Sequence, residues 1–177
     1  MNIVATATYA IARLAAPHMI RQRSGFIGQI SSPGGAFDFY GSADCIARGA
    51  LDRLAQALSH ELGEFGISSV SIWPTYVRTE RILRAQQGEA EGISIDGAIN
   101  LSEDADSPEF VGTTIAHLIA DKDHAKLSGK VHTIYHLAKR YGLKDVDGSE
   151  PALSAFLKAG LSIVPDVYTS GEEDPVG

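Results

Sequence analysis

Hydrophobic residues recur at helical spacing in two long stretches of the chain. Residues 2–22 carry apolar side chains every three or four positions, and residues 44–64 repeat the pattern. This spacing places the apolar side chains on one face of an amphipathic helix. Pro17 lies late in the first stretch and is expected to bend or shorten that helix. A third helix is predicted over residues 108–120.

Three shorter apolar runs have the length and composition of buried strands. They lie at residues 26–31, 67–73 and 130–135, and they alternate with the predicted helices. Alternation of this kind predicts an α/β fold with a parallel sheet. Polar residues dominate 79–107, which is predicted as a loop region. Three strands make a small sheet whose edges need cover, so we expect a neighbouring segment or chain beside it.

The composition of the 177 residues narrows the class of protein. Hydrophobic residues make up 44% and charged residues 21%, as in ordinary globular domains. The net charge of -7 argues against general nucleic-acid binding, which needs a basic face. We expect no membrane span and no signal peptide. The single cysteine, Cys45, cannot form an internal disulfide, so a cytoplasmic location is predicted.

Four stretches, taken in order, carry a family resemblance. Residues 25–32 form a strand that ends in Ser-Ser, and the helix from Ala50 onward continues as Leu-Asp-Arg-Leu-Ala. Residues 66–79 form a strand followed by Pro-x-x-Val-x-Thr, and residues 128–142 form a last strand with the segment after it. In this order they resemble the C-terminal half of the short-chain dehydrogenase/reductase family.

The resemblance implies a fold and marks what is missing from it. It implies a partial Rossmann-like parallel sheet of about three strands with flanking helices over residues 1–148, followed by a tail at 149–177. In the family, an N-terminal βαβ half carries a Gly-rich turn of the type Thr-Gly-x-x-x-Gly-x-Gly, which binds the dinucleotide pyrophosphate. The sequence contains no such turn. We therefore expect the nucleotide-binding half to be missing from this chain.

The family's proton-transfer residues are a tyrosine and a lysine four positions later. The phenol exchanges a proton with the substrate, and the lysine assists it and binds the cofactor ribose. Aligned on the helix from Ala50, these positions hold Asp44 and Arg48. An alternative alignment uses Tyr40, with Asp44 in the lysine position. A carboxylate has no proton to donate and arginine stays charged, so either alignment predicts impaired catalysis.

Further positions match family site residues, each with a structural alternative. Ser32 matches the serine that polarises the substrate oxygen, but a loop serine can equally satisfy backbone groups. Asn2 matches a supporting asparagine or a helix N-cap. The family's cofactor-binding turn corresponds to Pro74, Val77 and Thr79, with Thr79 near the nicotinamide. The spacing of the histidines predicts no metal site.

Three hypotheses follow for function. The first is an NAD- or NADP-dependent oxidoreductase acting on a small carbonyl or alcohol, truncated and impaired, which alone binds little or no cofactor. The second is a non-catalytic assembly or regulatory protein. In relatives the helices matching 2–22 and 44–64 pair across a dimer interface, so a homo-oligomer is expected. The third is a gene fragment whose other half is encoded upstream.

Overall fold

The computed structural model describes residues 2–37, 41–74, 76–88, 105–151 and 153. Its main sheet has three parallel strands in the order β1-β2-β5. β1 is Gly25–Ile30, β2 is Ile67–Trp73 and β5 is Val131–Thr133. The central strand β2 is buried along its whole length. The predicted α/β fold with a small parallel sheet is therefore confirmed.

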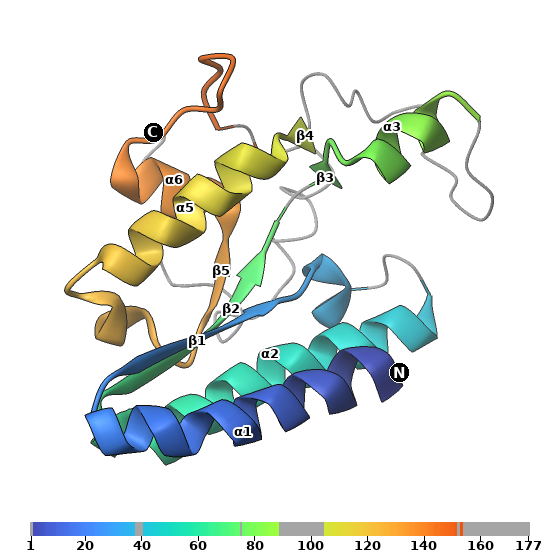
Figure 1. Cartoon of the computed structure of the whole chain (residues 1–177). Helices are drawn as coiled ribbons and strands as arrows, with labels where there is room; N and C mark the ends of the chain where they lie inside the picture. Colours follow the sequence, from blue (N-terminus) through green and yellow to red (C-terminus); the bar gives the residue numbers. More distant parts are fainter. Residues whose placement is uncertain (1, 38–40, 75, 89–104, 152, 154–177) are drawn as a thin grey trace.

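Helices cover both faces of this sheet. A π-helical turn, η1 (Asn2–Thr6), leads into α1 (Ala7–Gln22), and α1 lies beside α2 (Ser42–Leu62) on one face. On the other face lie α5 (Pro108–Ala120) and α6 (Ile134–Tyr141), as Figure 1 shows. Burial of apolar side chains on both faces is what stabilises a parallel sheet of this type.

Two hydrophobic clusters fill the spaces between these layers. The cluster under α1 and α2 consists of buried side chains from the helices and β2: Ala12, Leu58, Leu62 and Ile67. The larger cluster, under α5 and α6, consists of Val70, Ile72, Phe110, Leu118, Leu127, Ile134, Leu137 and Ala138. The apolar stripe predicted for the second helix thus faces the sheet, as its periodicity requires.

The predicted strand at 130–135 is too long. β5 ends at Thr133, and Ile134 and Tyr135 begin α6 instead. The Thr133 hydroxyl accepts a hydrogen bond from the backbone N–H of His136 at 3.1 Å, which caps the helix. A short apolar run does not distinguish a strand from a buried helix, and here the capping threonine decides where one becomes the other.

The region 79–107, for which the sequence predicts a loop, contains regular structure at its described ends. α3 spans Glu80–Gln86 and begins after Thr79, whose hydroxyl accepts from the N–H of Ile82. β3 (Tyr76–Val77) pairs in parallel with β4 (Ala105–Asp106). The loop prediction is therefore wrong at both ends, whereas residues 89–104 lie outside the described residues.

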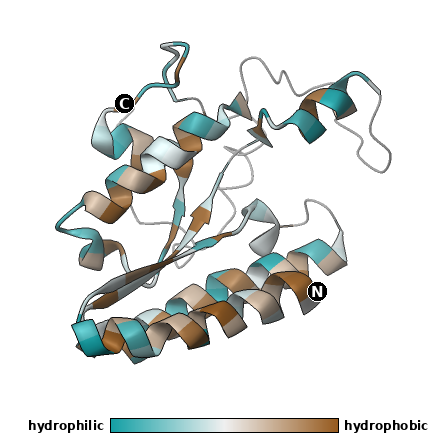
Figure 2. Ribbon diagram, in the orientation of Figure 1, coloured by the Kyte–Doolittle hydropathy of each residue, from teal (hydrophilic) through white to brown (hydrophobic). Residues whose placement is uncertain are grey.

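The outer face of α1 is apolar and exposed. Figure 2 shows hydrophobic residues along this helix, and Ile11 and Leu14 expose 68% and 74% of their surface. Pro17 lies inside the helix without ending it. By length and mean hydropathy alone, Ile3–Gln22 is apolar enough to cross a membrane. Core helices and N-terminal signal sequences meet the same criterion, so the expected absence of a membrane span stays a prediction.

Candidate functional site

Ser32 lies at the carboxyl end of β1, where ligands bind in open parallel sheets. Its backbone is extended, with φ −159° and ψ 166°, and the 3-10 turn η2 (Pro33–Gly35) follows it. The preceding residue fixes the strand end, because the N–H of Ser31 donates to the carbonyl of Ile72 on β2 at 2.8 Å. The Ser31 hydroxyl also donates to the Arg48 carbonyl at 3.2 Å.

Asp44 and Arg48 face the same turn from the first part of α2. Arg48 Nε donates to Asp44 Oδ1 at 3.1 Å, and the exposed fractions of the Arg48 and Asp44 side chains are 30% and 24%. A Cβ on Gly34 would lie 2.8 Å from Asp44 Oδ2 and 3.4 Å from Ser32 Oγ. The structure therefore brings Ser32, Asp44 and Arg48 together around Gly34.

Two oxygen atoms of this cluster are buried without a hydrogen-bond partner among the described residues. They are Ser32 Oγ and Asp44 Oδ2. Most buried polar atoms in proteins are hydrogen-bonded, so such atoms call for a reason and often occur at functional sites. An ionised carboxylate only accepts hydrogen bonds. Both oxygens can therefore accept a hydrogen bond from a bound group.

A second carboxylate, which the sequence reasoning missed, lies two turns further along α2. Asp52 is buried, and its Oδ1 accepts from Ser71 Oγ at 2.5 Å and from Trp73 Nε1 at 3.0 Å. Burial raises the pKa of Asp52, although these two donors, Ser31 and the charge of Arg48 act in the opposite direction. The signal was present in the sequence, because residues 44, 48 and 52 follow each other at four-residue spacing on one helix face.

Three other predicted site residues lie after the end of β2. Pro74 follows the end of β2, Val77 lies in β3, and the Thr79 hydroxyl caps α3. Thr79 is exposed, and the hydrogen bond that its hydroxyl accepts from Ile82 serves the helix rather than a ligand. Asn2 lies in the first turn, but its side chain is outside the described residues, and so is the whole of Tyr40. The alternative alignment through Tyr40 is therefore untested.

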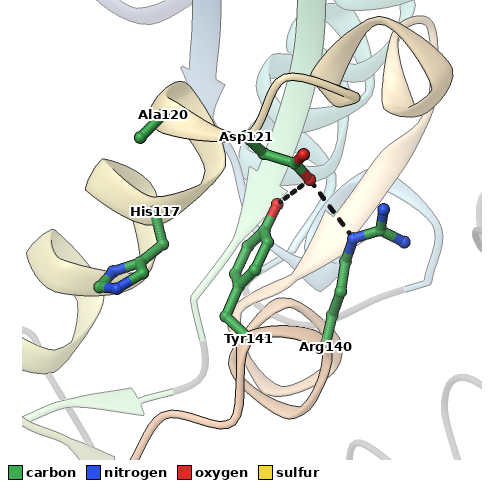
Figure 3. Close-up of a pocket in the computed structure, with 5 residues that line it drawn as sticks. All are labelled: His117, Ala120, Asp121, Arg140 and Tyr141. Carbon is green, nitrogen blue, oxygen red and sulfur yellow. Dashed lines mark hydrogen bonds and ion pairs between the residues drawn. The ribbon is translucent and has the colours of Figure 1, made fainter.

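A separate pocket of about 470 Å³ lies between α5 and α6. Figure 3 shows the Tyr141 hydroxyl and Arg140 converging on Asp121, with His117 beside the tyrosine ring. The hydroxyl donates to Asp121 Oδ2 at 2.9 Å. Burial and the neighbouring Asp121 carboxylate raise the pKa of Tyr141 to about 12. The predicted site residues do not line this pocket.

The histidines, cysteine and acidic residues in the described part of the chain form no group of three that could hold a metal ion. Around η2, the described residues bring together the Ser32 hydroxyl, the Asp44 and Asp52 carboxylates and the Arg48 guanidinium. That Arg48 and Thr79 contact the ribose and nicotinamide of a dinucleotide stays a prediction from the family resemblance. Arg48 Nε is engaged with Asp44, and its side chain is partly exposed.

The fold and this cluster place the chain in a class of Rossmann-like α/β proteins, and sequence comparison identifies the family. The family model for short chain dehydrogenases matches residues 1–90. The chain therefore belongs to the short-chain dehydrogenase/reductase family.

Two relatives are named dehydrogenase/reductase SDR family member 1. The Mus musculus protein is 37% identical over 132 residues, which is 73% of this chain and 42% of the relative. The Homo sapiens protein is 35% identical over 133 residues, with the same coverage. The chain thus spans less than half of the length of these curated relatives.

Solved structures of similar fold cover about the same part of the chain. The TT0495 protein of Thermus thermophilus has a TM-score of 0.61 and 27% identity, covering 75% of this chain and 56% of that one. ElxO with NADP bound has a TM-score of 0.60 and 25% identity, covering 72% and 51%. Both are matched over little more than half of their length.

Proposed function

We propose that this chain carries the substrate-side half of an NAD(P)-linked oxidoreductase fold in which proton transfer is impaired. The observation that carries the proposal is the Asp44–Arg48 ion pair beside Ser32. In the alignment on the helix from Ala50, these two positions correspond to a phenol and an ammonium group in the family. A carboxylate already paired with a guanidinium has no proton to donate to a carbonyl oxygen.

The cofactor part of the proposal rests on family resemblance. NADP is bound in the solved structure of ElxO, which this chain resembles over 72% of its length. A pyridine nucleotide would supply the hydride. Of this chain's own residues, Arg48 would contact the ribose and Thr79 would lie near the nicotinamide. Ser32 would bind the oxygen of a small carbonyl or alcohol. Tight binding needs a pyrophosphate-binding turn, for which the sequence has no Gly-rich motif.

Fluorescence titration of the 177-residue chain with NADH and NADPH tests the cofactor part. We expect no saturable binding, or binding weaker than about 1 mM, because the sequence has no Gly-rich turn to bind the pyrophosphate. Micromolar binding by the chain alone would contradict the idea that the pyrophosphate site lies outside these residues.

A chimera tests the catalytic part. It joins the dinucleotide-binding half of ElxO to this chain and compares the native residues with the double substitution Asp44→Tyr and Arg48→Lys. We expect NADPH-dependent carbonyl reduction to rise by about 100-fold or more in the substituted chimera, the usual contribution of a placed general acid. Arg53→Lys, an exposed change on the same helix, serves as control.

The chimera also separates the two alignments. Rescue by Asp44→Lys alone would favour Tyr40 as the proton donor. A native chimera as active as the doubly substituted one would refute the proposal that Asp44 and Arg48 impair catalysis.

The second candidate is a non-catalytic assembly protein. It is favoured by the exposed apolar side chains of Ile11 and Leu14 on α1 and of Ile46 on α2, which is 57% exposed. Apolar faces of this kind commonly mark protein–protein contacts. We propose homo-oligomer formation through α1 and α2, and light scattering of the purified chain distinguishes it from a monomer.

A further inference from the structure

β3 and β4 lie side by side in the fold, although residues 78–104 separate them in the sequence. β3 pairs with β4 over two residues each, Tyr76 with Ala105 and Val77 with Asp106. Arg78 follows directly and secures the pairing, because its N–H donates to the Asp106 carbonyl at 2.9 Å. Its Nη1 also donates to the Ala105 carbonyl at 2.7 Å. A pair of two-residue strands is too short to be stable alone, so the hydrogen bonds from Arg78 help to hold β3 and β4 together.

The carboxylate of Asp145, from the C-terminal part of the chain, bonds to the residues that follow β3 and β4. Asp145 Oδ2 accepts from Arg78 Nη2 at 3.0 Å and from the Ser107 N–H at 2.9 Å. Asp145 Oδ1 accepts from the Ser107 hydroxyl at 2.5 Å and from the Val146 N–H at 2.6 Å. We call Arg78, Ser107 and Asp145 the clasp.

The clasp also fixes the start of α5. The Ser107 hydroxyl that donates to Asp145 accepts in turn from the N–H of Phe110 at 3.0 Å, so the N-cap of α5 is part of the same network. Phe110 is buried in the cluster under α5 and α6. Hydrogen bonds to a charged group are about twice as strong as neutral ones. Asp145 therefore has the partners needed to hold three segments together.

The charges around Asp145 support this arrangement. Its side chain is 6% exposed and faces Arg78, which also lies 3.8 Å from the exposed Asp147. Burial raises the pKa of Asp145. The Ser107 and Val146 donors and the charge of Arg78 together lower that pKa by more than burial raises it, so it lies below its ordinary value. A buried carboxylate that stays charged is one whose donors compensate for its desolvation.

We propose that Asp145 is a positioning residue that couples β3, β4 and the start of α5 to the C-terminal loop around residues 143–151. Movement of that loop would loosen β3, β4 and the start of α5 together. Arg78 follows the end of β2, which is parallel to β1, so these two strands lead into Arg78 and Ser32 from the same edge of the sheet. The inference stands independently of whether the Ser32 cluster is catalytic.

Hydrogen exchange of the full chain tests the proposal with Asp145→Asn and Asp123→Asn as a matched pair. Asp145→Asn keeps the size of the side chain and removes its charge. We expect exchange in peptides covering 76–79 and 105–111 to rise by about tenfold or more, with β1 and β2 unchanged. Asp123→Asn makes the same chemical change at an exposed position that is paired with Lys126 outside the clasp, and it should leave both peptides close to wild type.

A second variant keeps the test decisive if Asp145→Asn does not fold. Arg78→Gln removes the other charge of the clasp from a partly exposed position and should loosen the same peptides. The double variant should then exchange no faster than the worse single variant, because both changes break one network. Exchange that rises evenly over the whole chain, or independent effects of the two substitutions, would overturn the coupling.

Discussion

Asp52 has two carboxylate oxygens in different surroundings. Oδ1 receives hydrogen bonds from Ser71 and Trp73 on β2, whereas Oδ2 is buried without a partner among the described residues. Burial raises the pKa of this carboxyl group despite those donors. The folded protein therefore binds a proton at Asp52 more tightly than the unfolded chain does, and the charged form carries a cost in stability.

Asp52→Asn should remove this pH dependence. In the wild type the cost is present at pH above the folded-state pKa and disappears as pH falls toward the unfolded value of 3.8. We expect the wild type to gain stability relative to the variant as pH is lowered from about 8 to about 4, with the variant equally or more stable near neutrality. Thermal unfolding across this range measures the difference.

The control for this measurement is Asp123→Asn, an exposed carboxylate in a surface ion pair with Lys126. Its melting temperature should follow the wild type at every pH, because exposed pairs contribute little. If the curves of wild type and Asp52→Asn run parallel, Asp52 does not titrate with a raised pKa.

Among the secondary-structure elements, the turn η2 packs unusually close to α2. A Cβ on Gly35 would meet the Asp52 carboxylate and would lie 3.2 Å from the backbone carbonyl carbon of Arg48. On the helix side, a Cβ on Gly49 would lie 3.4 Å from the Gly35 carbonyl oxygen. Small residues on both sides thus let η2 approach the helix, and this contact sets where Ser32 lies relative to Asp44.

Gly35→Ala should therefore separate η2 from α2. We expect a loss of about 1–3 kcal/mol in the free energy of unfolding, the usual cost of overpacking. Gly112→Ala is the matched change, because nothing lies within 4 Å of a Cβ at this exposed position in α5. It should gain about 0.5–1 kcal/mol. Denaturant unfolding measures both, and a harmless Gly35→Ala would mean that η2 is free to shift.

In the molecule as a whole, β1 is an edge strand of the sheet, and the apolar face of α1 is exposed to solvent. β1 pairs with β2 on one side only among the described strands. Parallel sheets are normally covered at their faces and edges. Both features support the proposal that this chain works beside another segment or a second copy, with α1 and α2 in the contact.

Leu14→Asp tests the α1 surface. Leu14 is 74% exposed, so a charge there should leave the fold intact while disrupting a buried helix–helix contact. We expect light scattering to report a shift from oligomer to monomer. Ile119→Asp changes a 51% exposed apolar residue on α5 and should leave the assembly unchanged. A wild-type chain that is monomeric at all concentrations would rule out this interface.

Local patterns along the chain are enough to predict the helices and strands whose apolar residues repeat over several turns. Periodicity is a local property, so it predicts α1, α2, α5 and the parallel sheet, and four-residue spacing places Asp44 and Arg48 on one face. It fails at residues 134–135, where one capping hydrogen bond to Thr133 outweighs an apolar run that suits strand or helix equally.

The partners of the buried charges depend instead on how distant elements pack. Asp52 meets Ser71 and Trp73 because α2 packs on β2, and Asp145 meets Arg78 across 67 positions of sequence. A buried carboxylate needs donors from any element that packs against it, and such packing is not recorded in local spacing. For this reason the sequence indicated the Ser32 cluster, whereas the carboxylates that hold its surroundings became visible only in the fold.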